Sequence, residues 1–531
     1  MMVEREQTNG APKKSPLLLL IIGLVAIAAV GLLVGVPWWE KDQAREIKEL
    51  LADSPGKYTA ESVEVSFWSK GVVISGLKGT LPYLGGKIDL VLDKLTAAGV
   101  SLSSFSKNEV LTLADTLTCS GFKGILSMDD PAGLLGNTPV RQNISFAHLE
   151  AKGLRGNVVA LREAGMDSPE AIKKGLEAIK GFRIASISAK DYKTSMDAGF
   201  PLPMESTIES FTAENLSLLS SGPSIWSNFI MSLSGQELCR VESLRLKKFS
   251  VPDFFSPVLE LQSATDISFE KREELAGEAI LAKLVEEPFD IEGLSVSNAT
   301  FRIPGQEAVT LKEYSLDAKC SPEAVVFQQS FGELLLPPSV YATLDSDAAM
   351  FAKQYGKPLV FSGSSRLSAN QKDGKGTLDV EQLSLKEKEL GSISFNVDLV
   401  FGARGGNSFK DLLEKGADWK IKKAKAVFED KGMVEQAFTL IHTQQANALG
   451  EDNAAASGVA AIRAEVVAEI QKEAQRESNA DKRALAEGFA KLLEQPGVLI
   501  IDANPEKPQA VEAAFAPVGM FNVSTSFVPA Q

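Results

Sequence analysis

Most of the chain carries the hydrophobic pattern of β-strands. From Tyr58 onward apolar residues alternate with polar ones, as in Val63, Val65 and Phe67, and Gly and Ser residues separate the alternating segments. Alternation with period two places every second side chain on the same face of a strand. Turn residues between such segments favour sequential antiparallel strands. We therefore predict a β-rich region over residues 57–430.

Within this region one spacing recurs, with hydrophobic residues separated by three, two, three and two positions. The complete copies are Ile208, Phe211, Ala213, Leu216, Leu218; Val241, Leu244, Leu246, Phe249, Val251; and Ile291, Leu294, Val296, Ala299, Phe301. Shorter copies begin at Phe146, Ile184, Val380 and Ile421. In a regular strand the members would fall on opposite faces, so each copy needs an extra residue, as a bulge or a tight bend. We predict a β-rich α+β fold built on a long, curved antiparallel sheet of such strands.

Helical spacing appears at the edges of this region and within it. A helical stalk is expected over residues 40–56, a helix opening at Ser168-Pro169 and closing at Gly181, and others over 339–355 and 408–413. The segment 431–531 combines a helix over 433–448, an α-hairpin over 453–493 broken at Ser478-Asn479, a short helix near 510–515, and two closing strands. The hairpin has a single apolar stripe, so we expect it to pack on the sheet.

The strongest single signal lies before the stalk. Residues 17–36 form an unbroken apolar run without a charge, which is the length an α-helix needs to cross a bilayer. The expected membrane anchor comprises Leu17, Ile21, Leu24, Ile27, Val30, Leu33, Val36, Trp38 and Trp39. The two tryptophans follow the run, where amphipathic rings prefer the membrane interface.

Two interpretations of this run compete, a cleaved signal peptide and a retained signal-anchor. The long apolar core and the Val36-Pro37-Trp38 sequence suit signal peptidase poorly and favour the anchor. Lys13 and Lys14 favour a cytoplasmic N-terminus. We therefore expect a disordered tail over residues 1–15 and a transmembrane signal-anchor over 16–39. The protein would then be a bacterial inner-membrane protein with the bulk of its chain in the periplasm.

Composition excludes several classes of function. The net charge is −14 without a dense basic cluster, which argues against nucleic acid as a partner. The three cysteines lie far apart, and we expect buried free thiols, although one pair could oxidise. Only two histidines occur, without ligand spacing, so no metal or other cofactor is expected. Nucleophile motifs and phosphate-binding loops are missing from the sequence, and we expect no enzyme.

The order of these segments resembles a known family. The strand Val63-Glu64-Val65-Ser66-Phe67-Trp68-Ser69-Lys70-Gly71-Val72 after the anchor is similar to the start of bacterial envelope proteins of the YdgA type and the broader AsmA-like group. The expected strand over residues 241–251 looks like the strand repeats of AsmA-like proteins. The C-terminal order also looks like that of YdgA-like proteins, with a strand, a helical hairpin and then Gln495-Pro496-Gly497-Val498. The resemblance implies a periplasmic β-rich body and a role in phospholipid transport or envelope homeostasis.

Two functional hypotheses follow. In the first, the protein binds membrane lipid on the apolar face of its sheet or supports cell-envelope homeostasis. In the second, it is a scaffold that binds an envelope protein partner through its helical hairpin and has no ligand groove. The pattern predicts one apolar face but leaves open whether that face is exposed or filled by covering segments.

Overall fold

The computed structural model divides into two compact units, residues 1–280 and 281–531. The residues it describes are 40–53, 58–66, 70–83, 86–100, 110–128, 140–157, 176–197, 203–253, 289–321, 323–372, 375–403, 417–449, 458–510 and 520–530, with the single positions 256, 271, 275, 283 and 287. The predicted transmembrane segment, the tail before it and the predicted helix over 408–413 lie outside these residues. Within the described part, no helix is both long and apolar enough to cross a membrane.

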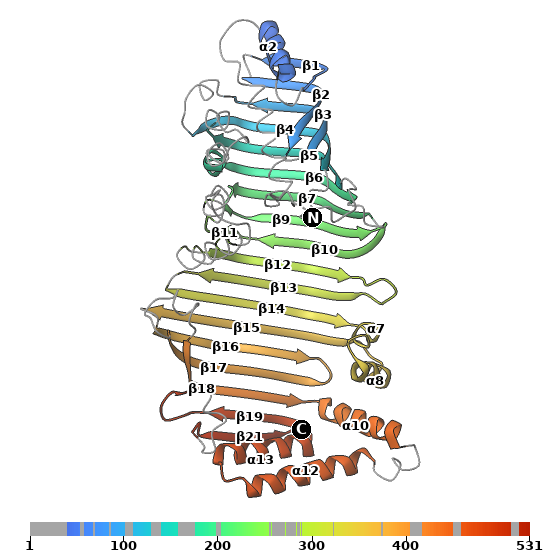
Figure 1. Cartoon of the computed structure of the whole chain (residues 1–531), viewed down its shortest axis with the longest axis vertical. Coiled ribbons are helices and arrows are strands. Elements are labelled where there is room, and N and C mark those ends of the chain that lie inside the picture. The colour runs from blue at the N-terminus through green and yellow to red at the C-terminus, as the bar shows by residue number, and fades with distance from the viewer. Residues whose placement is uncertain are drawn as a thin grey trace, which may run out of the picture. The chain divides into compact units, whose positions relative to one another are not determined.

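The first unit is an antiparallel sheet whose main strands pair largely in sequence order (Figure 1). Its elements are α2 (Glu40–Asp53), β1 (Ser62–Ser66), β2 (Gly71–Tyr83), β3 (Gly86–Ala98), β4 (Leu111–Met128), β5 (Val140–Gly156), β6 (Ile184–Asp197), β7 (Met204–Leu216), β8 (Ser220–Ser221), β9 (Ser224–Leu233), β10 (Gln236–Leu246) and β11 (Lys248–Ser250). The short β8 pairs with β11. Of the helix predicted up to Gly181, the structure describes one turn over residues 176–180.

Bends in the strands of this unit lie at the same level across the sheet. The aligned positions are Gly76, Asp93, Gly121, Ala147, Asp191, Glu209 and Asn228, one from each of β2 to β7 and β9. Alternate members, beginning with Gly76, have a positive φ between 49° and 65°, a conformation that favours Gly, Asn and Asp. Each of these strands has one extra residue at the bend, so the pairing of neighbouring strands keeps the same register on both sides of it.

These bends explain the repeated spacing in the sequence. The interval of three between Ile208 and Phe211 contains the bend position Glu209, and the interval between Ala213 and Leu216 contains Asn215, which also has a positive φ. The extra residue at each bend shifts the alternation of side chains by one position, so all hydrophobic members of a copy lie on the same face of the sheet. In β5 the buried residues of this set are Ile144, Phe146, Leu149, Ala151 and Leu154. The predicted bent strands are confirmed.

The hydrophobic core of the first unit lies along the apolar face of β2 to β7. Leu77 and Leu92 are fully buried, and one continuous cluster of buried residues extends from β1 to β7. The helix predicted over 40–56 is present as α2, and its Ile47 and Leu51 are 4% and 0% exposed within this cluster. Helix α2 therefore closes the β1 end of the core through its apolar side.

The second unit is also an antiparallel sheet (Figure 1). Its strands are β12 (Phe289–Phe301), β13 (Val309–Cys320), β14 (Ala324–Leu336), β15 (Leu359–Lys372), β16 (Lys375–Glu387), β17 (Gly391–Ala403), β18 (Ala417–Asp430), β19 (Gly497–Ala503), β20 (Gln509–Ala510) and β21 (Val523–Pro529). Its register shifts between Ile291 and Leu294 and between Val380 and Leu383, so bulges lie in the intervals of three residues that the sequence pattern marks.

The helices of the second unit are α7 (Pro338–Tyr341), α8 (Ser346–Tyr355), α10 (Met433–Leu449), α12 (Val459–Arg476) and α13 (Ala480–Glu494). The segment predicted as one helix over 339–355 is two helices, because the Asp345 side chain accepts a hydrogen bond from the Ala348 N–H and starts α8 anew. Of the short helix predicted near 510–515, Ala510 instead lies in β20, and the remaining residues are outside the described part.

The α-hairpin is confirmed as α12 and α13, with Asn479 capping α13 at the predicted break. It packs on the end of the sheet, as expected from its apolar stripe. The rings of Phe428 in β18 and Phe489 in α13 have centroids 5.6 Å apart, and Leu499 of β19 is fully buried. The hairpin thus covers the sheet at β18, β19 and β21.

Candidate functional site

The register of the second unit gathers hydrophobic side chains on one face of β12 to β17. Three cross-strand rows define it, and together their eighteen residues are called the apolar face below. The first row is Ile291, Ala318, Phe327, Leu367, Val380 and Val397; the second is Leu294, Leu316, Gln329, Ser365, Leu383 and Phe395; the third is Val296, Tyr314, Phe331, Gly363, Leu385 and Ile393. None of these side chains carries a charge.

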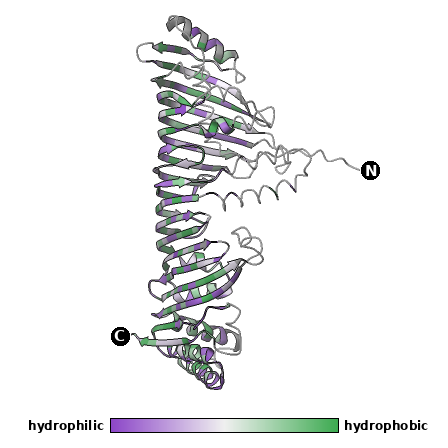
Figure 2. Ribbon diagram, turned by 90° about the vertical axis from the view of Figure 1, so that its left-hand side faces the viewer, coloured by the Kyte–Doolittle hydropathy of each residue, from purple (hydrophilic) through white to green (hydrophobic). Residues whose placement is uncertain are grey.

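The apolar face is exposed to a degree unusual for such residues. Of the eighteen, only Ala318 is buried; Leu383 and Leu385 remain 49% and 43% exposed, and the others are half-buried. The matching face of the first unit is filled, since Leu92 and Cys119 there are 0% exposed. Figure 2 shows apolar and polar residues mixed along the strands of both units, as expected for strands whose alternate side chains point to opposite faces.

The reverse side of β12 to β17 is polar. A row of serines crosses it at one level, namely Ser295, Ser315, Ser330, Ser364, Ser384 and Ser394. The hydroxyls of Ser315 and Ser330 lie 2.7 Å apart, and the Lys312 Nζ lies 2.7 Å from the Glu333 Oε1. A sheet with one wet and one apolar side needs either a covering layer or an apolar ligand on the second side.

Two buried carboxylates hold the border of the apolar face near the helices. Glu387 is 7% exposed and accepts hydrogen bonds from the N–H groups of Val360, Glu389 and Leu390 at 2.6–2.9 Å. Asp430 is 4% exposed and accepts from the N–H groups of Gly432 and Val434. Because backbone donors satisfy both carboxylates, they fix the β16–β17 turn and the start of α10 and have a structural role.

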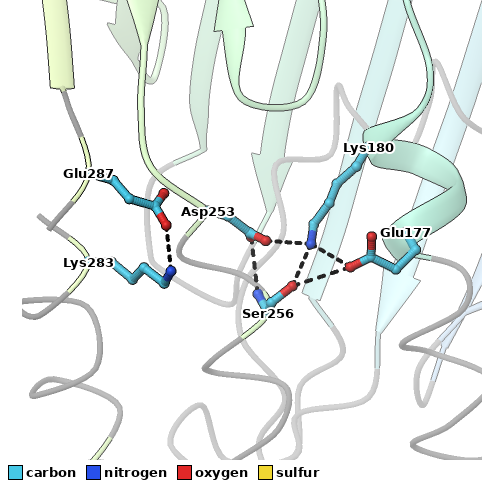
Figure 3. A network of polar contacts seen from close by, with 6 residues as sticks. All are labelled: Glu177, Lys180, Asp253, Ser256, Lys283 and Glu287. Carbon is cyan, nitrogen blue, oxygen red and sulfur yellow. Dashed lines mark hydrogen bonds and ion pairs between the residues drawn. The ribbon is translucent and has the colours of Figure 1, made fainter.

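A polar cluster in the first unit combines residue types that also occur in hydrolases. Lys180 contacts Asp253 and the Ser256 hydroxyl and lies 2.6 Å from the Glu177 Oε1 (Figure 3). Burial by itself lowers the pKa of Lys180, but the hydrogen bonds to Asp253 and Glu177 outweigh it and raise that pKa. Lys180 therefore stays protonated and cannot act as the base that would activate Ser256. The cluster joins the turn at 176–180 to the segment after β11.

Lys283 and Glu287, also drawn in Figure 3, form a separate ion pair at helical spacing in the second unit. Both side chains are partly exposed, and such pairs contribute little to stability. We assign no function to this pair.

The cysteines do not form a reactive site. Cys119, Cys239 and Cys320 are free thiols, and burial raises the pKa of each, that of Cys119 to about 12. A raised pKa disfavours the thiolate, which is the nucleophilic form. Among the described residues no group of His, Cys, Asp or Glu could hold a metal ion.

The residues predicted as the membrane anchor, Leu17 through Trp39, lie outside the described residues, so the structure does not place them. Comparison with known proteins adds no assignment: neither the protein-family models nor the curated proteins match this chain. The resemblance to AsmA-like proteins remains a prediction from the sequence.

Sequence reasoning missed most of the apolar face. The repeated spacing marks β12 and β16, but β13, β14, β15 and β17 escaped it, together with the polar residues Tyr314, Gln329 and Ser365. A usable signal was present in β13, where Tyr314, Leu316, Ala318 and Cys320 alternate with polar residues.

Proposed function

We propose that this protein is a non-enzymatic, membrane-anchored protein of the bacterial periplasm that binds the acyl chains of lipids on its apolar face. The observation that carries the proposal is the exposure of Leu383, Leu385 and their neighbours on a face without charge. Each methylene buried there contributes about 0.8 kcal/mol, so a single acyl chain would supply a large driving force.

The surroundings of the apolar face favour lipid over a protein partner bound through the hairpin. The buried residues of α12 and α13, such as Val467 and Leu492, belong to the packed stripe that the hairpin presents inward. A protein partner bound to the hairpin would contact its polar outer side, whereas the apolar face of β12 to β17 offers a large uncharged surface. The predicted anchor and the resemblance to AsmA-like proteins support the same proposal, because the anchor would tether the chain to a membrane that contains lipid and the resemblance implies a role in phospholipid transport or envelope homeostasis.

Lipid extraction tests the proposal. The chain from Glu40 onward is expressed in a bacterial periplasm, purified without detergent and analysed by mass spectrometry for co-purified lipid. We expect phospholipid well above the amount found with an unrelated periplasmic protein of similar size. A lipid content equal to that control would contradict acyl-chain binding.

The membrane location is tested separately. The full chain should sediment with inner membranes, and a chain lacking residues 1–39 but directed to the periplasm should be soluble there. A C-terminal reporter enzyme that works only in the periplasm should be active in the full chain. Activity of a cytoplasm-specific reporter instead would overturn the proposed topology.

A further inference from the structure

The apolar face contains one polar spot. Among its eighteen residues the polar side chains are Tyr314, Gln329 and Ser365, on the three consecutive strands β13, β14 and β15. Gln329 and Ser365 are cross-strand partners, and the Tyr314 hydroxyl donates a hydrogen bond to the Gln329 Oε1 at 3.4 Å. The spot thus holds three side chains that can reach one another, within a surface that is otherwise hydrocarbon.

The three side chains of this spot are neutral and can offer hydrogen-bond donors to a ligand. The Gln329 Oε1 accepts the hydrogen bond from Tyr314, so the amide N–H groups of Gln329 remain as donors for a ligand, and the Ser365 hydroxyl can supply a further donor. The face supplies no cation to compensate an anion, and a charged group would lose hydration on such a surface. A neutral acceptor, above all a carbonyl oxygen, fits the donors without that cost.

The neighbours of the spot define what else the ligand must carry. Phe327 and Leu367 lie in the row on one side, and Phe331 lies in the row on the other, where its ring would be only 2.6 Å from a Cβ added at Gly363. Apolar surface therefore extends from both sides of the donors. A ligand that matches this arrangement has a carbonyl group with hydrocarbon attached to it.

We propose that Gln329 and Ser365, with Tyr314 orienting the amide, bind the ester or amide carbonyl of an acyl lipid whose chains lie on the apolar face. This inference rests on the proposed function and adds the group of the lipid that the face recognises. Without the donors the face would distinguish lipids by chain length alone; with them it prefers acyl chains over alkyl chains of the same length.

The test uses the full chain reconstituted in proteoliposomes that contain a photoactivatable phospholipid, either with ester-linked chains or with ether-linked chains that lack the carbonyl. Labelling of peptides from β12 to β17 is quantified by mass spectrometry. We expect the ester lipid to label the wild-type protein about 3- to 10-fold more than the ether lipid, the effect of one net hydrogen bond.

Substitutions at the donor residues distinguish loss of the hydrogen bonds from a general loss of structure. Gln329→Leu combined with Ser365→Ala should bring the ratio of ester to ether labelling close to one, and Gln329→Met alone should lower it. Gln328→Leu is the matched control, because Gln328 is the adjacent residue on the polar side of β14 and pairs with Arg366. It should keep the wild-type ratio. Thermal unfolding confirms that each variant is folded.

The failures are distinguishable. If neither lipid labels the wild-type protein, the proposed function is wrong. If both lipids label it equally, or if Gln329→Met and the double variant keep the wild-type preference, acyl-chain binding stands and the carbonyl site is wrong.

Discussion

At the scale of single residues, the bends of the first unit are the most demanding positions. Gly121 has a φ of +65°, and a Cβ there would lie 1.8 Å from the Asp93 Oδ2 in the neighbouring strand. The residue therefore needs both the left-handed backbone and the empty space above it. In the second unit Asp317 lies beside the bend residue Gly293 of the neighbouring strand, as Asp93 lies beside Gly121. The Asp317 Oδ1 accepts a hydrogen bond from the Gly293 N–H at 2.6 Å.

Gly121→Ala should consequently destabilise the first unit by more than the about 1–2 kcal/mol that a left-handed alanine costs. Gly235→Ala is the control, since Gly235 has a φ of +77° and open space around it, so it isolates the backbone term. Urea unfolding of both variants measures the difference. Equal losses would show that Asp93 gives way without cost.

The ion-paired cluster around Lys180 predicts a pH dependence. Burial would raise the pKa of Asp253, but the hydrogen bonds from Lys180 and Ser256 lower it below its usual value. The stabilising contribution of Asp253 is thus complete above the unfolded pKa of about 3.9 and disappears as the pH falls through the lower folded value.

Asp253→Asn should lower the melting temperature at pH 6, and its difference from wild type should shrink as the pH falls from 5 to 3. Calorimetry over this range checks the prediction. Glu64→Gln, which removes an exposed carboxylate of β1, should show little effect at any pH. A pH-independent difference for Asp253→Asn would mean that the ion pair contributes nothing.

At the scale of elements, one carboxylate joins the hairpin to the last strand. The Asp481 side chain, in the first turn of α13, accepts hydrogen bonds from the N–H groups of Phe521 and Val523 at 2.8 and 2.9 Å. Asn479, one residue before the helix, accepts from the N–H groups of Asp481 and Lys482. The N-terminus of α13 is therefore stabilised internally and tied to β21.

Asp481→Ala leaves two backbone donors without their partner and should cost about 1–3 kcal/mol per group that stays buried. Hydrogen exchange of the Val523 amide should accelerate more than that of amides in β16. Glu487→Ala, at an exposed position of the same helix, should leave both stability and exchange unchanged. Unchanged protection of Val523 in Asp481→Ala would contradict this role.

At the scale of the whole molecule, the two units present the same kind of apolar face in different states. In the first unit Leu77 and Leu92 are fully buried, whereas in the second Leu383 and Leu385 are 49% and 43% exposed. A filled face contributes to folding stability, and an exposed face is available to a ligand. The proposed lipid binding therefore concerns the second unit, whose apolar face is the more exposed of the two.

Leu383→Lys combined with Leu385→Lys should greatly reduce the co-purified lipid while the protein stays folded, because lysines at exposed positions can keep their ammonium groups in water. Gln382→Lys adds a charge one residue away at an exposed position of β16. It should retain the wild-type lipid content, measured by mass spectrometry. Wild-type lipid content in the double variant would locate the lipid elsewhere.

The sequence by itself determined the local structure of this protein. Alternation and the spacing of Ile208, Phe211, Ala213 and Leu216 predicted strands with an extra residue, since side-chain direction follows directly from backbone period. The helical stripe and the Ser478-Asn479 break predicted the hairpin, because caps and amphipathic faces are written in neighbouring residues.

Only the tertiary structure decided which apolar residues are covered. Leu92 and Leu385 both sit in alternating strands and have equivalent local patterns, yet one is 0% and the other 43% exposed. The difference depends on which distant segments pack over each strand, and period two contains no information about that. The meeting of Tyr314, Gln329 and Ser365 depends in the same way on the register of three strands, which pairing across the sheet sets.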